Sequence, residues 1–350
     1  MASVAPEEFH VSRITQRDIA RLAGVSQAVV SLVLNNRTDA TTRIAPETRQ
    51  RVLDVIRETG YAADPVARRM VRQHNQILGV FTYESVFPSA SADFYYPFLR
   101  GIEECAEQLR CDLLLFTSAP VTDGRRKVFH ENNRLRIADG CLLLGRDIPH
   151  DELARLNREN YPFVAVGRRD DAGGPVPCVG ADYAAATREL VERARQLGHR
   201  EFAYVGAGEG AESADDRMNG FRAGTQGSGR HERTAGRSAG ETLDALLAAG
   251  VTTAVVEGHD DGVALIRAAR ERGVDVPGDL SVVVTGVPAE SADADIACTG
   301  FRIPRREMGW QSVELLAALL EDESTTMLQR LLPCHFVEGQ TLGEPRKDRS

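Results

Sequence analysis

The feature that most constrains the fold is a regular alternation of short apolar runs with helical stretches over residues 76–342. Strands buried on both faces read as continuous apolar runs, and helices between them are the connections that parallel pairing requires. The pattern predicts an α/β body of two lobes with parallel sheets, and ligands of such folds bind in a cleft beyond the carboxyl ends of the strands. The expected strands are 77–83, 111–117, 140–145, 163–167, 201–208, 252–258 and 280–286, and the expected helices are 100–110, 184–198, 261–273 and 307–321.

Composition narrows the class of protein. The 350 residues are 42% hydrophobic and 27% charged. They contain no apolar run of about 18 residues, so we expect no membrane-spanning helix. The N-terminal MASVAPEEFHVSR carries acidic residues and no apolar core, unlike a signal peptide. The six cysteines are scattered without a C-x-x-C pair, which is typical of buried reduced thiols and fits a cytoplasmic location.

The charges are unevenly divided along the chain. The net charge is −9, yet residues 13–74 hold eleven arginines against six acidic residues. Residues 75–350 hold 31 basic against 43 acidic residues. A basic first part ahead of an acidic remainder indicates that only the first part meets a polyanion such as DNA.

The stretch RDIARLAGVSQAVVSLVLNN contains two short helical patterns separated by a polar break. Thr15 can cap the first helix, Gly24 can end it, and Ser26 can cap the second. Ile19 and Leu22 are expected to share the face that closes on the valines of the second helix. Such a glycine-containing break folds two helices into a helix-turn-helix, whose second helix can lie in the major groove of DNA. An ordinary helical hairpin is the alternative.

A third helix is expected from Pro46, which suits a first-turn position, to Gly60, with Val52 and Ile56 facing inward. Three such helices can close a small core.

The next segment, YAADPVARRMVRQH, has features of a hinge. Pro65 begins a helix of only about seven residues, far below the length that is stable alone in water. Two copies packed on a DNA minor groove would order it, with Met70 as an apolar wedge between base pairs. A plain charged linker is the alternative. The expected phosphate contacts of this segment come from Arg68, Arg69 and Arg72.

The segments TQRDIARLAGVSQAVVSLVLNN and RIAPETRQRVLDVIRETGYAADPVARRM resemble the head and hinge of the lactose/galactose-repressor (LacI/GalR) family. The motifs D-[IV]-A-x-x-A-G-V-S, V-S-x-V-L-N-N, T-R-x-x-V and Y-x-x-x-P-x-A-x-x-[LM] carry the resemblance. RGIEE, LGHR, RMNGF and VPGDLSVV resemble the family's body, which is like a periplasmic sugar-binding protein. The resemblance implies a helix-turn-helix DNA-binding domain at 13–60, a hinge helix or linker at 61–75, and a two-lobed effector-binding and dimerisation domain at 76–342.

The resemblance also implies DNA contacts by position. Gln27 can bond an adenine bidentately and Ala28 can touch a thymine methyl group. Leu32 stands where many relatives carry arginine, which indicates an apolar contact with the base pair. The remaining positions implied by the resemblance are Thr15, Ser26, Ser31 and Asn35 at phosphates, and Ala67 and Met70 in the minor groove.

Effector-binding positions follow from the same resemblance. Phe94 and Tyr95 come just before the first body helix, where relatives stack a ring on the effector. Arg217 stands where an arginine bonds effector hydroxyls or a carboxylate, and Asp261 where an acid or amide closes the cleft. Rings with an Arg/Asp pair suit a sugar and nearly as well a nucleobase, while the alternative for each residue is an ordinary surface position. Two further candidates are Arg168 and Ser213.

Three stretches depart from the family pattern. Between Phe221 and Thr253 the chain is short and rich in Gly, Ser and Arg, so a strand of the relatives is expected to be missing or deformed. TGVPAESADADIA replaces the usual G-[FY]-D-D, and both departures border the expected cleft. Residues 85–98 are expected to be extended and to form an aromatic lip.

Two motifs favour other functions on weak grounds. GAGEGA at 206–211 fits a dinucleotide-binding pattern, but no acid follows at the end of a second strand, so NAD and other cofactors are not expected. The triplet His259-Asp260-Asp261 has no second histidine cluster or nucleophile motif beside it, so neither a metal site nor an enzyme is expected. A sugar-binding module without gene control leaves residues 13–74 unexplained.

The sequence therefore predicts a homodimeric, sequence-specific transcriptional regulator, most consistent with a repressor, that binds a pseudo-palindromic DNA operator and no membrane. Its effector is expected to be a sugar or sugar derivative, and a purine or nucleoside is the alternative. The tail EPRKDRS lacks a leucine heptad, so a tetramer built on a terminal coiled coil is not expected.

Overall fold

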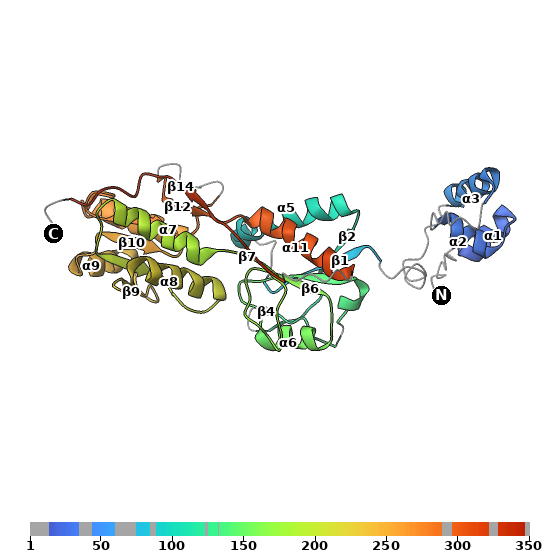
Figure 1. Ribbon diagram of the computed structural model, residues 1–350, viewed down its shortest axis with the longest axis horizontal. Helices are drawn as coiled ribbons and strands as arrows, with labels where there is room; N and C mark the ends of the chain where they lie inside the picture. Colours follow the sequence, from blue (N-terminus) through green and yellow to red (C-terminus); the bar gives the residue numbers. More distant parts are fainter. Residues whose placement is uncertain are drawn as a thin grey trace, which may run out of the picture. The chain divides into compact units, whose positions relative to one another are not determined.

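The computed structural model describes residues 14–34, 44–59, 75–84, 89–122, 125–131, 133–288, 296–321 and 328–346. Contacts between residues divide the chain into two units, Met1–Asn75 and Gln76–Ser350 (Figure 1). We call residues 14–59 the head and residues 76–346 the body, and each is described by itself. Among the helices of these ranges, none combines the length and apolar character needed to cross a membrane.

The head consists of α1 (Gln16–Ala23), α2 (Gln27–Leu34) and α3 (Pro46–Thr59). Thr15 caps α1 as predicted, because its hydroxyl accepts a hydrogen bond from the Asp18 N–H at 3.3 Å and its own N–H donates to the Asp18 carboxylate at 3.0 Å. Gly24 ends the helix with φ +64°, a left-handed conformation that costs glycine little. The chain therefore turns directly into α2, and the predicted helix-turn-helix is confirmed.

Apolar side chains of all three helices close the core of the head. These residues fall on one face of each helix, so the core needs only about two turns from α1 and α2. The fully buried members are Ile19, Ala20, Ala23, Val30, Val33 and Val52.

Leu22 does not belong to this core, and the expectation that it would is wrong. It remains 56% exposed. The buried face of α1 is centred between Ile19 and Ala23, and Leu22 lies about 80° around the helix from that centre. The end of α1 is stabilised by Arg51 of α3, whose Nε donates a hydrogen bond to the Ala23 carbonyl at 2.9 Å.

The first lobe of the body is a six-stranded parallel sheet with helices on both faces. α5 (Ser89–Leu109) and α11 (Arg305–Leu320) cover one face, and α6 (His150–Arg158) lies on the other. A hairpin of β3 (Val121–Thr122) and β4 (Arg125–Arg126) and a single turn, η1 (Leu135–Ile137), complete the lobe. Its strands in spatial order are β13 (Gln329–Leu332), β7 (Cys178–Ala181), β6 (Phe163–Val166), β5 (Gly140–Leu144), β1 (Ile77–Thr82) and β2 (Asp112–Phe116).

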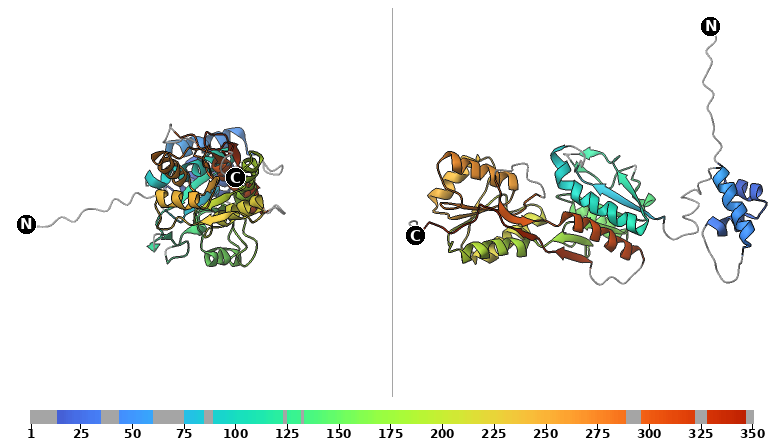
Figure 2. Two further views of the ribbon diagram at one scale, coloured as in Figure 1. Left: turned by 90° about the vertical axis from the view of Figure 1, so that its left-hand side faces the viewer. Right: turned by 90° about the horizontal axis from the view of Figure 1, so that it is seen from above.

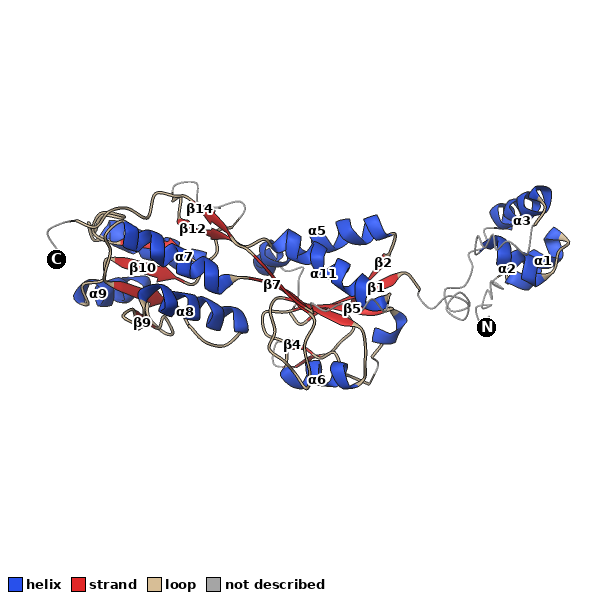
Figure 3. Cartoon of the chain, viewed as in Figure 1, coloured by secondary structure: helices blue, strands red, loops and turns tan. Residues whose placement is uncertain are grey.

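The second lobe repeats this plan (Figure 3). α7 (Tyr183–Gln196) and α8 (Glu212–Thr225) cover one face of its sheet, and α9 (Ala239–Ala248) and α10 (His259–Glu271) cover the other. All pairings are parallel except that of β14 with β12. Its strands in spatial order are β14 (His335–Val337), β12 (Thr299–Arg302), β11 (Ser281–Val284), β10 (Thr253–Val256), β8 (Phe202–Val205) and β9 (Arg230–Glu232).

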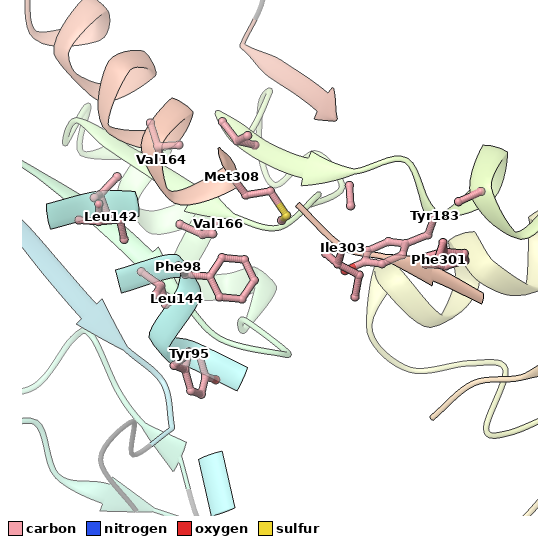
Figure 4. Packing of buried hydrophobic residues seen from close by; sticks show 14 of the residues in the cluster. Tyr95, Phe98, Leu142, Leu144, Val164, Val166, Tyr183, Phe301, Ile303 and Met308 are labelled. Atoms are coloured by element: carbon pink, nitrogen blue, oxygen red, sulfur yellow. The ribbon is translucent and has the colours of Figure 1, made fainter. Parts of the chain in front are cut away.

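The chain passes between the lobes three times, from β7 to α7, from β12 to α11 and from β13 to β14 (Figures 1 and 2). One apolar cluster follows these crossings from lobe to lobe. Figure 4 shows it running from Leu142 and Leu144 of β5 past Phe98 and Met308 to Tyr183. The alternate residues of the strands face the opposite layer, as the pleat of a sheet requires.

α5 and α11 lie side by side because each has a glycine at the point of contact (Figure 2). A Cβ on Gly101 would lie 1.9 Å from the Arg306 carbonyl oxygen, and a Cβ on Gly309 would lie 2.2 Å from that of Phe98. Both distances are far inside any real contact, so the backbones approach each other at a spacing that only glycine allows. This packing fixes the start of α11 against the N-terminal half of α5.

The seven expected strands are all present, and the predicted fold class is confirmed. Six other strands of the described residues were not expected. They are at most four residues long, and they are β3 and β4 of the hairpin and β7, β12, β13 and β14. Where a strand was expected to be missing or deformed, the three-residue β9 pairs with the edge of β8. All six cysteines are free and four are buried, as predicted.

The expectation for the segment before the first body helix is wrong. α5 begins at Ser89, eleven residues before the expected start, so Phe94 and Tyr95 lie within the helix instead of in an extended lip. Pro97 is the ninth residue of α5 and lies inside the helix, so the helix continues there at the cost of one backbone hydrogen bond.

We predict that Gly309→Ala lowers the stability of the body by about 2–3 kcal/mol, because the new methyl group must push α11 away from α5. Gly240→Ala, in α9, is the matched control, since a Cβ at this position meets only the guanidinium end of the Arg272 side chain. That change should be neutral or stabilise by about 0.5 kcal/mol. Thermal unfolding of both variants checks this, and equal midpoints would contradict the tight glycine contact.

Candidate effector cavity and DNA-facing surface

One face of α2 is open to solvent and carries the residues expected to read bases, together with Ser31, which is expected at a phosphate. Gln27 and Ala28 are exposed, and Ser31 and Leu32 one turn later are half-buried. Together they span an arc of about 140° on the helix. Val30 and Val33 lie on the opposite side of the helix and are buried. One face of α2 therefore packs on the core of the head, and the other face is exposed to solvent. The arrangement leaves a polar and methyl-bearing surface of the width that enters a major groove.

Thr15 and Ser26, two of the residues expected at phosphates, lie at the beginnings of helices, whereas Ser31 lies within α2. The Thr15 hydroxyl donates to the Asp18 carboxylate at 2.7 Å at the start of α1, and Ser26 Oγ accepts from the Val29 N–H at 3.4 Å at the start of α2. Hydrogen bonds from Thr15 lower the pKa of Asp18. Helix N-termini favour phosphate oxygens, so both positions suit backbone contacts. Asn35, Ala67 and Met70 lie outside the described residues.

The body contains a cavity of about 280 Å³ between its lobes. It lies beyond the carboxyl ends of β5 and β6 in the first lobe and of β8 and β10 in the second. Parallel pairing brings these ends to one edge of each sheet, as the sequence led us to expect. The lining residues are Phe94, Tyr95, Phe98, Leu144, Gly145, Arg146, Val166, Gly167, Arg168, Arg169, Tyr183, Glu209, Ala211, Ser213, Ala214, Arg217, Glu257 and Met308.

Aromatic rings form the apolar part of the cavity. Phe94 and Tyr95 meet edge to face with centroids 4.9 Å apart, and Tyr183 lies at the crossing from β7 to α7. Tyr95 is only 2% exposed, and its hydroxyl donates to the Glu84 carboxylate. Burial and this hydrogen bond raise the pKa of Tyr95. Tyr95 is therefore held in the wall of the cavity by its own contacts. Phe94 and Tyr183 remain as the rings that are placed to stack on a ligand.

Arginine side chains supply most of the charge around the cavity. The Arg217 guanidinium lies 3.9 Å from the Tyr183 ring centroid, and its Nη1 donates to the Ser213 carbonyl at 2.8 Å. Arg146 and Arg305 lie 4.7 and 5.0 Å from the Phe94 centroid. Burial lowers the pKa of Arg305, and the charges of Arg217 and Arg146 lower it further. The three guanidinium groups are thus close enough to repel one another.

Two further arginines bridge the lobes at the rim. Arg168 of the first lobe pairs with Asp216 on α8 at 2.7 Å, and Arg169 pairs with Glu212 on α8 at 3.5 Å. Burial opposes the charge on Arg168, yet its hydrogen bonds to Asp216 and Asp170 hold its pKa above the usual value. These ion pairs connect the loop after β6 to the first turns of α8, so they stabilise contact between the lobes.

The structure brings five of the six expected effector residues to the cavity: Phe94, Tyr95, Arg168, Ser213 and Arg217. Asp261 does not line it, because it lies in the first turn of α10 and is exposed. Burial and the neighbouring acids Asp260 and Glu257 raise the pKa of Asp261.

Sequence reasoning missed several cavity residues. Arg146 and Glu257 follow directly after the expected strands, so the rule that ligands bind at strand ends offered a signal for both. Tyr183 of the lining begins α7 at a crossing between the lobes, and no local pattern marks such a position. The same is true of Arg305, which begins α11 and lies near Phe94 outside the lining. Within the described ranges, no group of three or more His, Cys, Asp or Glu side chains is placed to hold a metal ion.

Comparison with known families places two matches on the chain. Residues 15–64 match the family described as bacterial regulatory proteins, lacI family. Residues 191–342 match the periplasmic binding protein-like domain. The first match falls on the head and the segment after it, and the second falls within the body.

Individual proteins are similar over nearly the whole chain. A catabolite control protein A from Priestia megaterium is 26% identical over 337 residues, which cover 93% of this chain and 98% of that protein. The lac repressor dimer bound to operator and the anti-inducer ONPF has a TM-score of 0.72 at 21% identity, covering 95% of this chain and all of that one. A complex of the regulator CelR with cellobiose has a TM-score of 0.61 at 23% identity, covering 94% and 100%. At these identities the structural matches support the fold alone.

We predict that Asp216→Asn loosens the contact between the lobes, because Arg168 loses its charged partner on α8. Amide hydrogen exchange in the first turns of α8 should rise about fivefold, which corresponds to about 1 kcal/mol. Asp170→Asn is the control, since it removes the other partner of the same arginine without touching the second lobe. Equal exchange in both variants would show that the bridge does not hold the lobes together.

Proposed function

The chain belongs to the LacI family of bacterial regulatory proteins, and we propose that it is a homodimeric transcriptional regulator, acting as a repressor, whose operator binding is controlled by a sugar or sugar derivative in the cavity between the lobes. The family consists of DNA-binding regulators, not enzymes. We further propose that it acts in the cytoplasm, where its operator DNA lies.

The exposed face of α2 supports the DNA part of this proposal. Gln27 and Ala28 lie at the start of the helix that the turn at Gly24 directs outward, and the core leaves them no internal role. An exposed amide and a methyl group are the chemistry that reads adenine and thymine in the major groove. The lac repressor, which shares the fold, binds operator as a dimer. A second copy of this chain would supply the other half-site.

The position of the cavity is the observation that carries the effector part. It takes its lining from strand ends of both lobes, so a bound ligand contacts both and favours their closed arrangement. Phe94 and Tyr183 offer rings to the apolar face of a sugar, and Arg217 and Glu257 offer partners for its hydroxyl groups. CelR, which has a similar fold, forms a complex with cellobiose. This supports a sugar rather than a purine as the effector.

Coupling to DNA follows from the ion pairs at the rim. Arg168 and Arg169 connect the first lobe to α8, so a ligand that tightens or opens the cavity changes these bridges. The first lobe is the one that follows the head along the chain. A shift in lobe closure therefore changes the geometry with which two copies present their heads.

An apolar surface of the first lobe supports the dimer. Leu113 on the edge strand β2 and Leu109 at the end of α5 each remain 38% exposed. Edge strands with exposed apolar side chains are suited to pairing with another chain.

We predict that Gln27→Ala costs about 1–3 kcal/mol of discrimination at one base pair, because the variant loses a bidentate contact. The DNA site is first selected from random duplexes with the full-length protein, and binding is then measured by fluorescence anisotropy on that site and on single-base variants. Gln50→Ala, an exposed glutamine on α3, is the control. Unchanged discrimination by Gln27→Ala would remove this residue from base reading.

We also predict that Arg217→Ala abolishes the response of DNA binding to ligand while the affinity for the selected DNA remains. The measurement is a DNA-binding assay with a panel of neutral sugars, sugar phosphates and nucleobases. Arg222→Ala, an exposed arginine on the same helix, should respond like the unmodified protein. A response retained by Arg217→Ala would contradict its placement in the site.

A further inference from the structure

Three arginines lie at or beside the cavity without the carboxylate partners that such side chains usually have. Arg146 and Arg217 line the cavity, and Arg305 lies outside the lining, 5.0 Å from the Phe94 ring centroid. Arg146, Arg217 and Arg305 form no ion pair with any acidic side chain that the structure describes. Their guanidinium groups rest on the rings of Phe94 and Tyr183. A cation that rests on an aromatic ring gains less free energy than burial of an unpaired charge costs.

The deficit is greatest at Arg305. Its Nε is buried and has no hydrogen-bond partner among the described residues. The neighbouring charges of Arg217 and Arg146 oppose its protonated form. A guanidinium remains protonated at neutral pH even so. The site thus concentrates positive charge that is not offset by ion pairs with the described acidic side chains.

Other charged groups at the cavity are already engaged. Arg168 and Arg169 pair with Asp216 and Glu212, and Glu209 pairs with the exposed Arg233. The Glu84 carboxylate accepts hydrogen bonds from the Tyr95 hydroxyl and the Arg146 backbone N–H.

The second lobe contributes acidic side chains as well as Arg217 of α8. Glu257 Oε2 accepts from the Gly208 N–H at 3.1 Å, and Asp182 caps α7 through the Ala185 N–H at 2.9 Å. Asp260 and Asp261 follow Glu257 at the start of α10. The cavity therefore has a cationic part next to Phe94 and an acidic part at Glu257, and the acidic part suits hydroxyl donors.

We propose that the natural effector is an anionic monosaccharide, whose phosphate or carboxylate group binds to Arg146 and Arg217 of the lining, next to the positive charge of Arg305, and whose hydroxyl groups point to Glu257. This inference rests on the proposed function and adds the charge and size of the ligand. Guanidinium groups bind phosphate and carboxylate bidentately, which would complete the hydrogen bonding of Arg146 and Arg217. A volume of about 280 Å³ lies at the lower end of ligand sites and fits one sugar ring with its substituent better than a disaccharide.

The first test uses inorganic phosphate as the probe on the full-length protein. Phosphate should raise the unfolding temperature more than chloride does at equal ionic strength. Arg305→Gln and Arg217→Gln should each weaken phosphate binding at least tenfold, measured by calorimetric titration. Arg306→Gln is the matched control, because this adjacent arginine points outward and pairs with Glu104.

A second readout separates ligand binding from a structural role of Arg305. Without phosphate, Arg305→Gln should unfold at the same temperature as the unmodified protein or higher, because the buried unpaired charge is gone. With saturating phosphate the order should reverse. Lower stability of Arg305→Gln without phosphate, or phosphate binding equal to that of the unmodified protein, would overturn the proposal.

The third test compares D-glucose, D-glucose 6-phosphate, D-glucuronate and adenine in calorimetry and in the DNA-binding assay. Tighter binding of either anionic sugar than of glucose supports the inference, and their ranking identifies phosphate or carboxylate. Preference for glucose or adenine over both anions overturns the inference but leaves a ligand-controlled regulator in place. Failure of the full-length protein to select any DNA site would instead contradict the proposed function.

Discussion

Parallel strand pairing is the constraint on which the rest of the body depends. When neighbouring strands run in the same direction, every loop that follows a strand emerges at the same edge of the sheet. The loops after β5 and β6 meet those after β8 and β10 across the space between the lobes. Arginines from positions as distant in sequence as 146 and 305 are brought together for this reason. The sequence around each arginine contains no pattern that predicts a binding site.

The sequence predicted the parts of the fold that local physics decides. Long apolar runs such as 140–145 could only be buried strands, and Thr15 and Gly24 carry the chemistry of helix ends. The short strands were hidden because their identity comes from their neighbours: β7 reads CVGA and β12 reads TGFR, and each is a strand only because the adjacent strand supplies hydrogen bonds. The early start of α5 was equally invisible, since the support for its first turns includes packing against α11.

The same distinction applies to the candidate cavity. Phe94, Tyr95, Ser213 and Arg217 could be placed by their motifs, because those motifs hold a fixed relation to the strand ends. Asp261 was expected at the cavity by the same reasoning, yet its position in the first turn of α10 leaves it outside the lining. Arg305 was missed because its relation to Phe94 depends on the close packing of α5 and α11 at Gly101 and at Gly309, and these helices are about two hundred residues apart in the chain. No pattern within a single segment contains that information.

The three passages of the chain between the lobes have a consequence for how such a protein can change over generations. Neither lobe is a continuous stretch of sequence, since the first needs α11 and β13 from the far end of the chain and the second needs β14. A lobe with a new ligand preference therefore cannot be acquired by joining genes at one junction. Ligand preference in this architecture must instead be altered in place, by substitutions and short insertions in the loops at the strand ends, while the frame around them is inherited whole.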